Sequence, residues 1–136
     1  MKIKWAIFFA MFLSEGCGNN SEPANNKDLE QNMMDLKIYQ ENLGDHIKSK
    51  KLQEASWLLE GMDSILHILN KRFNEHHKLT DPFSYFYKRR MLSPVQGIRK
   101  AIQLNDTVKA LDNYRLLVKR CNNCHADNDI DKEVKF

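Results

Sequence analysis

Two cysteines and one histidine stand close together in the stretch Cys121-Asn122-Asn123-Cys124-His125. On an α-helix the two thiols would lie about one turn apart, with the imidazole next to the second of them. Thiolate sulfur and imidazole nitrogen are strong ligands for transition metals, and thiols also form covalent bonds. This motif is therefore the part of the chain whose residue types and spacing best fit a chemical function.

Four kinds of site use such a set of side chains. In the first, two thiols add across the two vinyl groups of one haem, and the histidine that follows coordinates the iron. The second is a zinc site, for which His76 and His77 are the further histidines expected at this end of the fold. The third is a dithiol redox site, and the fourth is an incidental exposed disulfide.

The spacing favours covalent haem attachment. The chain has three cysteines and neither a second Cys-x-x-Cys pair nor a suitably spaced histidine pair to complete a zinc site. Dithiol redox sites lie at the start of a helix that follows a strand, whereas this pair comes at the end of a helical pattern. We therefore expect Cys121 and Cys124 to bind one haem c covalently, with His125 as the proximal iron ligand.

The first residues have the pattern of an export signal. Lys2 and Lys4 precede an apolar run over residues 5–13, and small residues then lead to Cys17. The apolar run is shorter than the roughly 20 residues that a helix needs to span a bilayer. Residues 1–16 are thus predicted to be a signal peptide, with a buried N-terminal helix as the alternative.

Residues 13–17 resemble the signal of bacterial lipoproteins, in which the cysteine after a small residue becomes lipidated. Lipidation of Cys17 would also explain why an exported protein has an odd number of cysteines. The polar residues 17–27 are predicted to form a flexible tether. The expected location is the periplasm, with the protein anchored to the membrane as a lipoprotein; a soluble exported protein is the alternative.

From residue 28 onward the apolar residues recur at the helical period. Two stripes predict helices over residues 28–47 and 52–73, joined by a short polar turn. The side chains of these stripes are Leu29, Met33, Leu36, Leu43 and Ile47 in the first, and Leu52, Ala55, Leu58, Leu59, Met62, Ile65, Leu66, Leu69 and Phe73 in the second.

The second half of the chain carries start signals for further helices. Asp81 is expected to be an N-cap with Pro82 at the first helical position, and Ser93-Pro94 repeats this signature. Residues 82–104 are therefore predicted to form one kinked helix or two short ones. The last helix is expected to begin at the polar residues 105–107 and to end at the cysteine motif.

No alternation of apolar and polar residues typical of strands appears, so the predicted fold class is all-α. We expect residues 28–136 to form a single domain, an antiparallel four-helix bundle with up-down-up-down topology and the haem at the end of the last helix. In that topology the end of the fourth helix lies near the start of the first helix and the end of the second.

Residues 101–125 resemble the last helix and preceding turn of the class II cytochromes c, the cytochrome c-prime family. The features that agree are a stripe of small and apolar residues, an aspartate at the turn, Tyr114 upstream of the motif, and the place of the Cys-x-x-Cys-His motif at the end of the helix. The resemblance is looser over residues 28–73, where the helix lengths and the stripe agree. It implies either a six-coordinate iron for electron transfer, with a methionine from the first helix, or a five-coordinate iron that binds a gas such as nitric oxide.

Two methionines in the first helix are candidates for the sixth ligand. Met33 lies on the apolar stripe, whereas Met34 points about 100° away from it. We expect Met33 to be the ligand and Met34 to be the alternative. His76 and His77 are expected to be solvated side chains of the loop.

The charges of the chain limit the other possibilities. The formal net charge of +3 comes without a basic cluster interleaved with aromatics, so no nucleic-acid partner is expected. Lys119 and Arg120 could neutralise haem propionates or serve as ordinary cations at a helix C-terminus. No pair of a nucleophile and a base is apparent, so the chain is not expected to be an enzyme.

The function expected from these features is one-electron transfer in the cell envelope by a monohaem c-type cytochrome. The expected partners are redox proteins of the envelope and the membrane that a lipid anchor enters, and a homodimer is a further option. The alternatives are a five-coordinate cytochrome that binds a diatomic gas, and a helical interaction module without haem.

Overall fold

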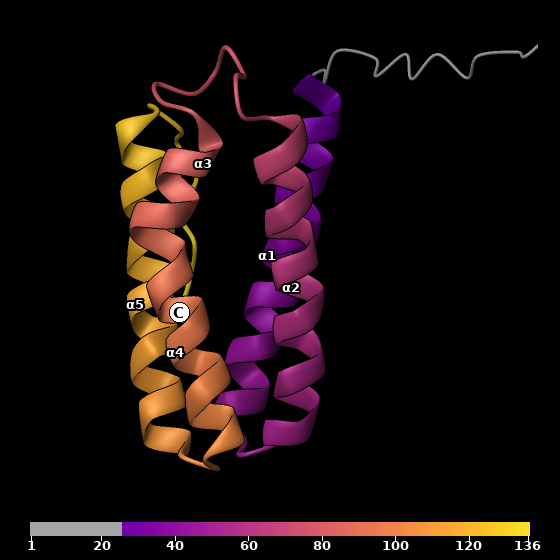
Figure 1. Ribbon diagram of the computed structural model, residues 1–136, viewed down its shortest axis with the longest axis vertical. Coiled ribbons are helices and arrows are strands. Elements are labelled where there is room, and N and C mark those ends of the chain that lie inside the picture. Colours follow the sequence, from indigo (N-terminus) through magenta and orange to yellow (C-terminus); the bar gives the residue numbers. More distant parts are fainter. Residues whose placement is uncertain (1–25) are drawn as a thin grey trace, which may run out of the picture.

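The computed structural model describes residues 26–136, and these residues form helices and no strand (Figure 1). The predicted signal peptide 1–16, the lipidation candidate Cys17 and the tether up to residue 25 lie outside the described residues. The elements are α1 (Asn26–Lys48), α2 (Leu52–Arg72), α3 (Phe83–Phe86), the π-helical segment η1 (Tyr87–Met91), α4 (Leu92–Gln103) and α5 (Thr107–Asp127).

Helices α1 and α2 form an antiparallel pair. The short turn between them passes through Lys50, whose backbone is left-handed with a φ of 59°. At the far end of the pair, Arg72 Nη2 lies 3.5 Å from Asp28 Oδ2, so the last turn of α2 meets the first turns of α1. The predicted stripes are confirmed as the faces through which the two helices enter the core.

The third helical stretch is continuous from α3 through η1 to α4 (Figure 1). In η1 the backbone N–H of Leu92 donates to Tyr87 O, five residues back, which is the bond of a π-helix. Pro94, which has no N–H to donate, follows in the first turn of α4, directly after the π-helical segment. The alternative of two separate helices, with Ser93-Pro94 starting the second, was therefore wrong.

The start of α3 also differs from the prediction. Pro82 occupies the N-cap position with an extended ψ of 139°, and no side-chain cap is formed there by Asp81. The amide oxygen of Asn74 takes over this role, because it accepts a hydrogen bond from Ser84 N–H at 3.1 Å. A residue of the preceding loop thus caps the helix, which the local sequence around residue 81 does not reveal.

Helix α5 begins as predicted. The side chain of Asp106 accepts a hydrogen bond from Lys109 N–H at 3.0 Å and caps the first turn. At the other end of the helix, Arg90 of η1 forms an ion pair with Asp127 at 2.5 Å. The third helical stretch and α5 are therefore also an antiparallel pair.

A single apolar core joins the two pairs. Its largest fully buried side chains come from every long helix and from the loop ends: Leu43, Ile47, Leu59, Met62, Leu66, Leu69, Phe73, Phe83, Phe86, Ile98, Tyr114 and Leu117. Among the described residues, no helix has the length and apolar character that a membrane crossing would require.

Candidate functional site

The cysteine motif occupies the last two turns of α5, and the side chains of Cys121, Cys124 and His125 lie on one side of this helix. Cys124 is buried, with 6% of its surface exposed, whereas Cys121 and His125 are half-buried. Both thiols are free rather than joined in a disulfide. The three side chains fall within an arc of about 100° around the helix, as their spacing requires.

The environment of the two thiols favours the protonated form. Burial raises the pKa of Cys121 to about 12, and the nearby Cys124 adds to this effect. Burial likewise raises the pKa of Cys124 to about 11. Dithiol redox sites instead lower the pKa of their attacking cysteine at a helix N-terminus. The raised pKa values and the position at the end of α5 both argue against the dithiol redox alternative.

The imidazole of His125 is held by the backbone of the segment that follows it. Its Nδ1 lies 2.6 Å from the carbonyl oxygen of Lys132. A carbonyl oxygen can only accept a hydrogen bond, so this contact favours the tautomer with the proton on Nδ1. The other nitrogen, Nε2, then has a free lone pair. Histidines that bind metals commonly have this second hydrogen bond to a carbonyl group.

Residues 128–136 form what we call the C-terminal strap, which turns back at the end of α5 and runs beside the helices (Figure 1). Asn122 binds the strap twice: its Nδ2 donates to Val134 O at 2.9 Å, and its Oδ1 accepts from Val134 N–H at 2.7 Å. Further along, Gln40 Nε2 of α1 donates to Lys135 O at 3.1 Å. The strap therefore connects the motif to α1.

Asn128 connects the end of α5 to the loop between α2 and α3. Its Nδ2 donates to Cys124 O at 2.7 Å, and its Oδ1 accepts from Thr80 N–H at 2.7 Å. The same loop reaches the start of α1, where Lys78 Nζ lies 3.5 Å from Glu30 Oε1. The motif, the loop and the first turns of α1 are thus at one end of the bundle. The sequence alone gave no signal for the role of Asn128.

The contact between α1 and α5 determines which residue of α1 lies level with the motif. Tyr114 Oη donates to Gln40 O at 3.1 Å, and Gln40 Nε2 donates to Tyr114 Oη. Seven residues, or about 10 Å, toward the start of α1 lead to Met33, and seven toward the end of α5 lead to Cys121. Met33 packs against the core, whereas Met34 is 59% exposed.

The two loop histidines differ in exposure. His77 is exposed as predicted, but the expectation of a solvated His76 was wrong, because this residue is 7% exposed. Its Nδ1 accepts a hydrogen bond from Lys78 N–H at 3.2 Å, and no described residue pairs with its buried Nε2. Burial, together with His77 and Lys78, lowers the pKa of His76 and keeps the ring neutral.

The aromatic residues after Pro82 divide into two groups. Phe83 and Phe86 are fully buried. The centroid of the Phe86 ring lies 5.5 Å from Cζ of Arg90, and Arg90 forms the ion pair with Asp127 at the end of α5. Tyr87 instead faces α2 and donates a hydrogen bond to Asp63 Oδ1 at 3.3 Å. Phe86 is therefore the aromatic residue that these contacts link to the motif end of α5.

The zinc and disulfide alternatives receive no support from the described residues. Within residues 28–136, no group of three or more His, Cys, Asp and Glu side chains is arranged to hold a metal ion. A zinc site of four such ligands therefore has no candidate in this part of the chain. An exposed disulfide is also not what the motif presents, because its cysteines are free and Cys124 is buried.

The two basic residues before the motif remain without partners in the described part of the chain. Lys119 is exposed and Arg120 is half-buried, and neither forms an ion pair with residues 28–136. Their position in the last turns of α5 agrees with either of the two roles considered for them.

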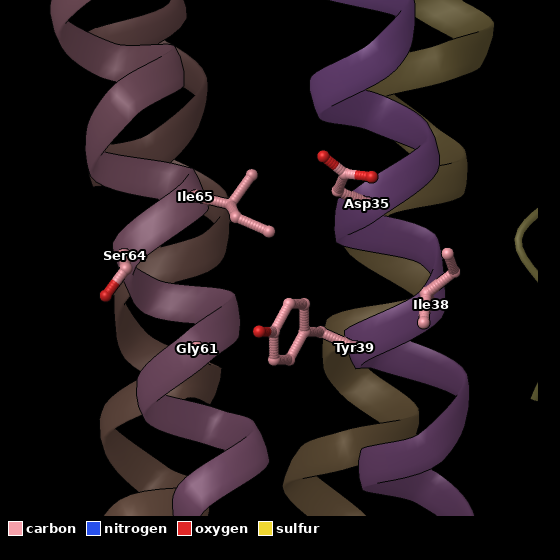
Figure 2. Close-up of a pocket in the computed structure, with 6 residues that line it drawn as sticks. All are labelled: Asp35, Ile38, Tyr39, Gly61, Ser64 and Ile65. Atoms are coloured by element: carbon pink, nitrogen blue, oxygen red, sulfur yellow. The ribbon is translucent and has the colours of Figure 1, made fainter.

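A shallow groove of about 540 Å³ lies between α1 and α2 (Figure 2). The ring of Tyr39 reaches across from α1 toward Gly61, and Ile65 and Asp35 line the groove beside it. None of the motif residues lines this groove, so it is separate from the candidate site.

Comparison of the chain with models of protein families, with curated protein sequences and with solved structures gives no match.

Proposed function

We propose that the protein is a monohaem c-type cytochrome that carries out one-electron transfer in the cell envelope. Haem c is bound covalently through Cys121 and Cys124, with His125 as the proximal ligand and Met33 as the sixth. We further propose that the helices form an up-down-up-down bundle of the class II kind, with the haem at the end of α5.

The observation that carries this proposal is the arrangement at the end of α5. Two free thiols three residues apart stand beside an imidazole whose Nδ1 is bound to Lys132 O at 2.6 Å. The free Nε2 lone pair and the two reduced thiols are the groups that a covalently attached haem requires. The donor set therefore fits the cofactor in both its identity and its protonation.

The protein would contribute attachment, axial ligation and an apolar environment. Haem supplies the one-electron redox change when it is bound. Cys121 and Cys124 fix it to the last turns of α5, and His125 Nε2 provides a lone pair whose basicity is increased by the hydrogen bond at Nδ1. The buried Phe83 and Phe86 exclude water from this end of the bundle.

Three contacts support the up-down-up-down topology and the assignment of Met33 as the sixth ligand. The ion pairs Asp28–Arg72 and Arg90–Asp127 join the ends of consecutive helical stretches, as expected for antiparallel neighbours. The Gln40–Tyr114 contact brings Met33 level with Cys121 along the bundle. Met33 also belongs to the partly buried residues that pack on the core, unlike the exposed Met34.

Location in the envelope and membrane attachment are part of the same proposal. They are supported by the pattern of residues 1–16 and by Cys17, which follow the order of a lipoprotein signal. Replacing Cys17 with serine is expected to release the protein from the membrane fraction without removing its haem.

The test is production of the full chain in a bacterial host that matures c-type cytochromes. Haem staining of a denaturing gel should show haem that stays with the polypeptide, and the reduced protein should give a low-spin spectrum. The double variant Cys121→Ser, Cys124→Ser should lose the stained band. Haem-free wild-type protein from this host would refute the proposal and leave the helical interaction module.

A five-coordinate cytochrome that binds a diatomic gas is a second candidate, favoured by the burial of Leu29. This residue lies one turn before Met33 on the same stripe and is 7% exposed, so it is buried more deeply than Met33. An aliphatic residue at the sixth position would leave the iron open to ligands. A high-spin reduced spectrum that shifts on addition of carbon monoxide would select this candidate.

A further inference from the structure

We propose that the C-terminal strap, anchored by Asn122, positions His125 by holding its proton on Nδ1 and directing Nε2 toward the cofactor. This role rests on the proposed function. It makes Asn122, which stands between the two cysteines, a positioning residue rather than a spacer.

The strap is attached to the side chain of Asn122. The amide side chain donates to Val134 O at 2.9 Å and accepts from Val134 N–H at 2.7 Å, so it pairs with both backbone groups of one strap residue. Lys132 lies two residues before Val134, and its own N–H donates to Ile130 O at 2.9 Å. The two contacts fix the backbone on both sides of the Lys132 carbonyl.

Beyond Val134 the strap is anchored to α1 and α5. Gln40 Nε2 donates to Lys135 O at 3.1 Å. The ring of Phe136 lies 5.6 Å from the ring of Tyr114, with Lys48 Nζ 4.3 Å above it. The end of the strap thus binds α1 and α5 at points that do not include His125.

The carbonyl group of Lys132 influences which nitrogen of the His125 imidazole holds the proton. A neutral imidazole in water exchanges its proton between the two nitrogens and favours Nε2, which would occupy the lone pair that a metal needs. The carbonyl at 2.6 Å from Nδ1 reverses this preference, because only a protonated Nδ1 can donate to it. The ring is thereby prepared as an Nε2 donor before any metal binds.

The motif contains its own matched control. Asn123 is the neighbour of Asn122 and has the same side chain, but it is exposed and makes no side-chain hydrogen bond to residues 28–136. The variants Asn122→Ala and Asn123→Ala therefore remove the same atoms from the same helix turn, and only the first removes the anchor of the strap.

The experiment measures the tautomer of His125 in the haem-free, reduced protein. Long-range ¹H–¹⁵N spectra at about pH 8, where an ordinary histidine is neutral, distinguish the two ring nitrogens. We expect Nδ1–H in the wild type and in Asn123→Ala, and a shift to mainly Nε2–H in Asn122→Ala. Nε2–H in the wild type, or an unchanged tautomer in Asn122→Ala, would overturn the proposal.

A second variant tests the anchor from the side of the strap. Val134→Pro removes the N–H that donates to Asn122 Oδ1, and it lies outside the helices, so the bundle should keep its far-UV circular dichroism. It should shift the tautomer in the same direction as Asn122→Ala. An Nδ1–H tautomer in this variant would count against the strap.

The effect of the strap on the haem iron is tested by measuring the reduction potential. In the haem-loaded protein, Asn122→Ala should raise the reduction potential relative to Asn123→Ala, because a histidine without its Nδ1 hydrogen bond is a weaker donor. Equal potentials would refute the role toward iron. Complete absence of covalent haem with a normal tautomer shift would refute the proposed function and leave the strap–histidine bond established.

Discussion

Gly44 of α1 lies directly against the ring of Tyr114 of α5. A Cβ atom at residue 44 would come within 3.0 Å of Oη, Cζ and Cε1 of this ring. Tyr114 is fully buried, and its hydroxyl group is bound to Gln40 one turn earlier in α1. This close approach fixes the level of α1 along α5, and with it the level of Met33 along the cysteine motif.

The substitution Gly44→Ala should destabilise the protein. A buried tyrosine ring held by hydrogen bonds cannot move aside easily, and overpacking of this kind costs about 1–3 kcal/mol. Because the ring is fixed, the cost should lie toward the upper end of this range, above the helix propensity of about 1 kcal/mol that alanine adds over glycine. Urea unfolding of the haem-free protein should show a lower midpoint.

Gly97→Ala is the matched control for this prediction. A Cβ atom there would meet the amide end of Asn113, which belongs to a flexible side chain that hydrogen-bonds its own helix at an exposed site. This end can rotate away, so the gain in helix propensity should be retained and the stability should stay equal or rise. A greater loss of stability in Gly97→Ala than in Gly44→Ala would contradict the importance assigned to the Tyr114 contact.

The haem-free, reduced protein should lose stability at alkaline pH. The pKa values of Cys121 and Cys124 rise from 9.0 to about 12 and about 11 in the folded state. The unfolded chain therefore releases these protons first, so the free energy of unfolding falls from about pH 9 upward. Each thiol contributes a slope of up to about 1.4 kcal/mol per pH unit.

The double variant Cys121→Ser, Cys124→Ser provides the comparison for this pH dependence. Serine does not ionise in this range, so the fall should begin later and be less steep. Tyr114 still contributes, because burial raises its pKa from 10.0 to about 12. The measurement is the urea midpoint between about pH 7 and pH 11, and equal slopes for both proteins would show that the thiols are not shielded.

Met33→Ala should change the spin state of the haem-loaded protein. In the proposed cytochrome, removal of the thioether would open the sixth position, so the reduced spectrum should become high-spin and respond to carbon monoxide. Met34→Ala is the control and should leave the spectrum unchanged, because this side chain is 59% exposed. An unaltered spectrum in Met33→Ala, with a change in Met34→Ala, would transfer the ligand role to Met34.

Asp63→Asn should weaken the contact between α2 and the third helical stretch. Asp63 accepts from Arg99 Nη2 at 2.9 Å and from Tyr87 Oη at 3.3 Å, and 16% of its side chain is exposed. Loss of its charge should reduce stability by about 1–2 kcal/mol. The measurement is again urea unfolding.

Glu60→Gln is the control for Asp63→Asn. Glu60 pairs with the same arginine at 3.1 Å, but its side chain is 60% exposed, so solvent screens the interaction. Its loss should cost less than about 0.5 kcal/mol. Equal effects of the two substitutions would show that the burial of Asp63 does not strengthen its interactions.

Periodicity predicted the helices well because an amphipathic stripe is a local property. The residues of α1 and α2 that carry the stripes enter the core, and Asp106 caps α5 as its sequence indicates. The prediction failed at the start of α3 and at His76. At the start of α3 the decisive partner is Asn74, ten residues away, which caps the helix. His76 is buried although it lies in a loop, and its ring packs against the ring of the core residue Phe73.

The sequence by itself determined the all-helical class, the positions of the helices and the chemical identity of the Cys121–His125 motif, because each of these depends on neighbouring residues. Only the tertiary structure decided which carbonyl group faces His125 Nδ1, the attachment of the strap to Asn122 and the level of α1 beside α5. These depend on which backbone and side-chain groups of distant segments meet. The strap has no helical period of its own, and its end is held where α1 and α5 pack together, by the hydrogen bond from Gln40 and the ring of Tyr114.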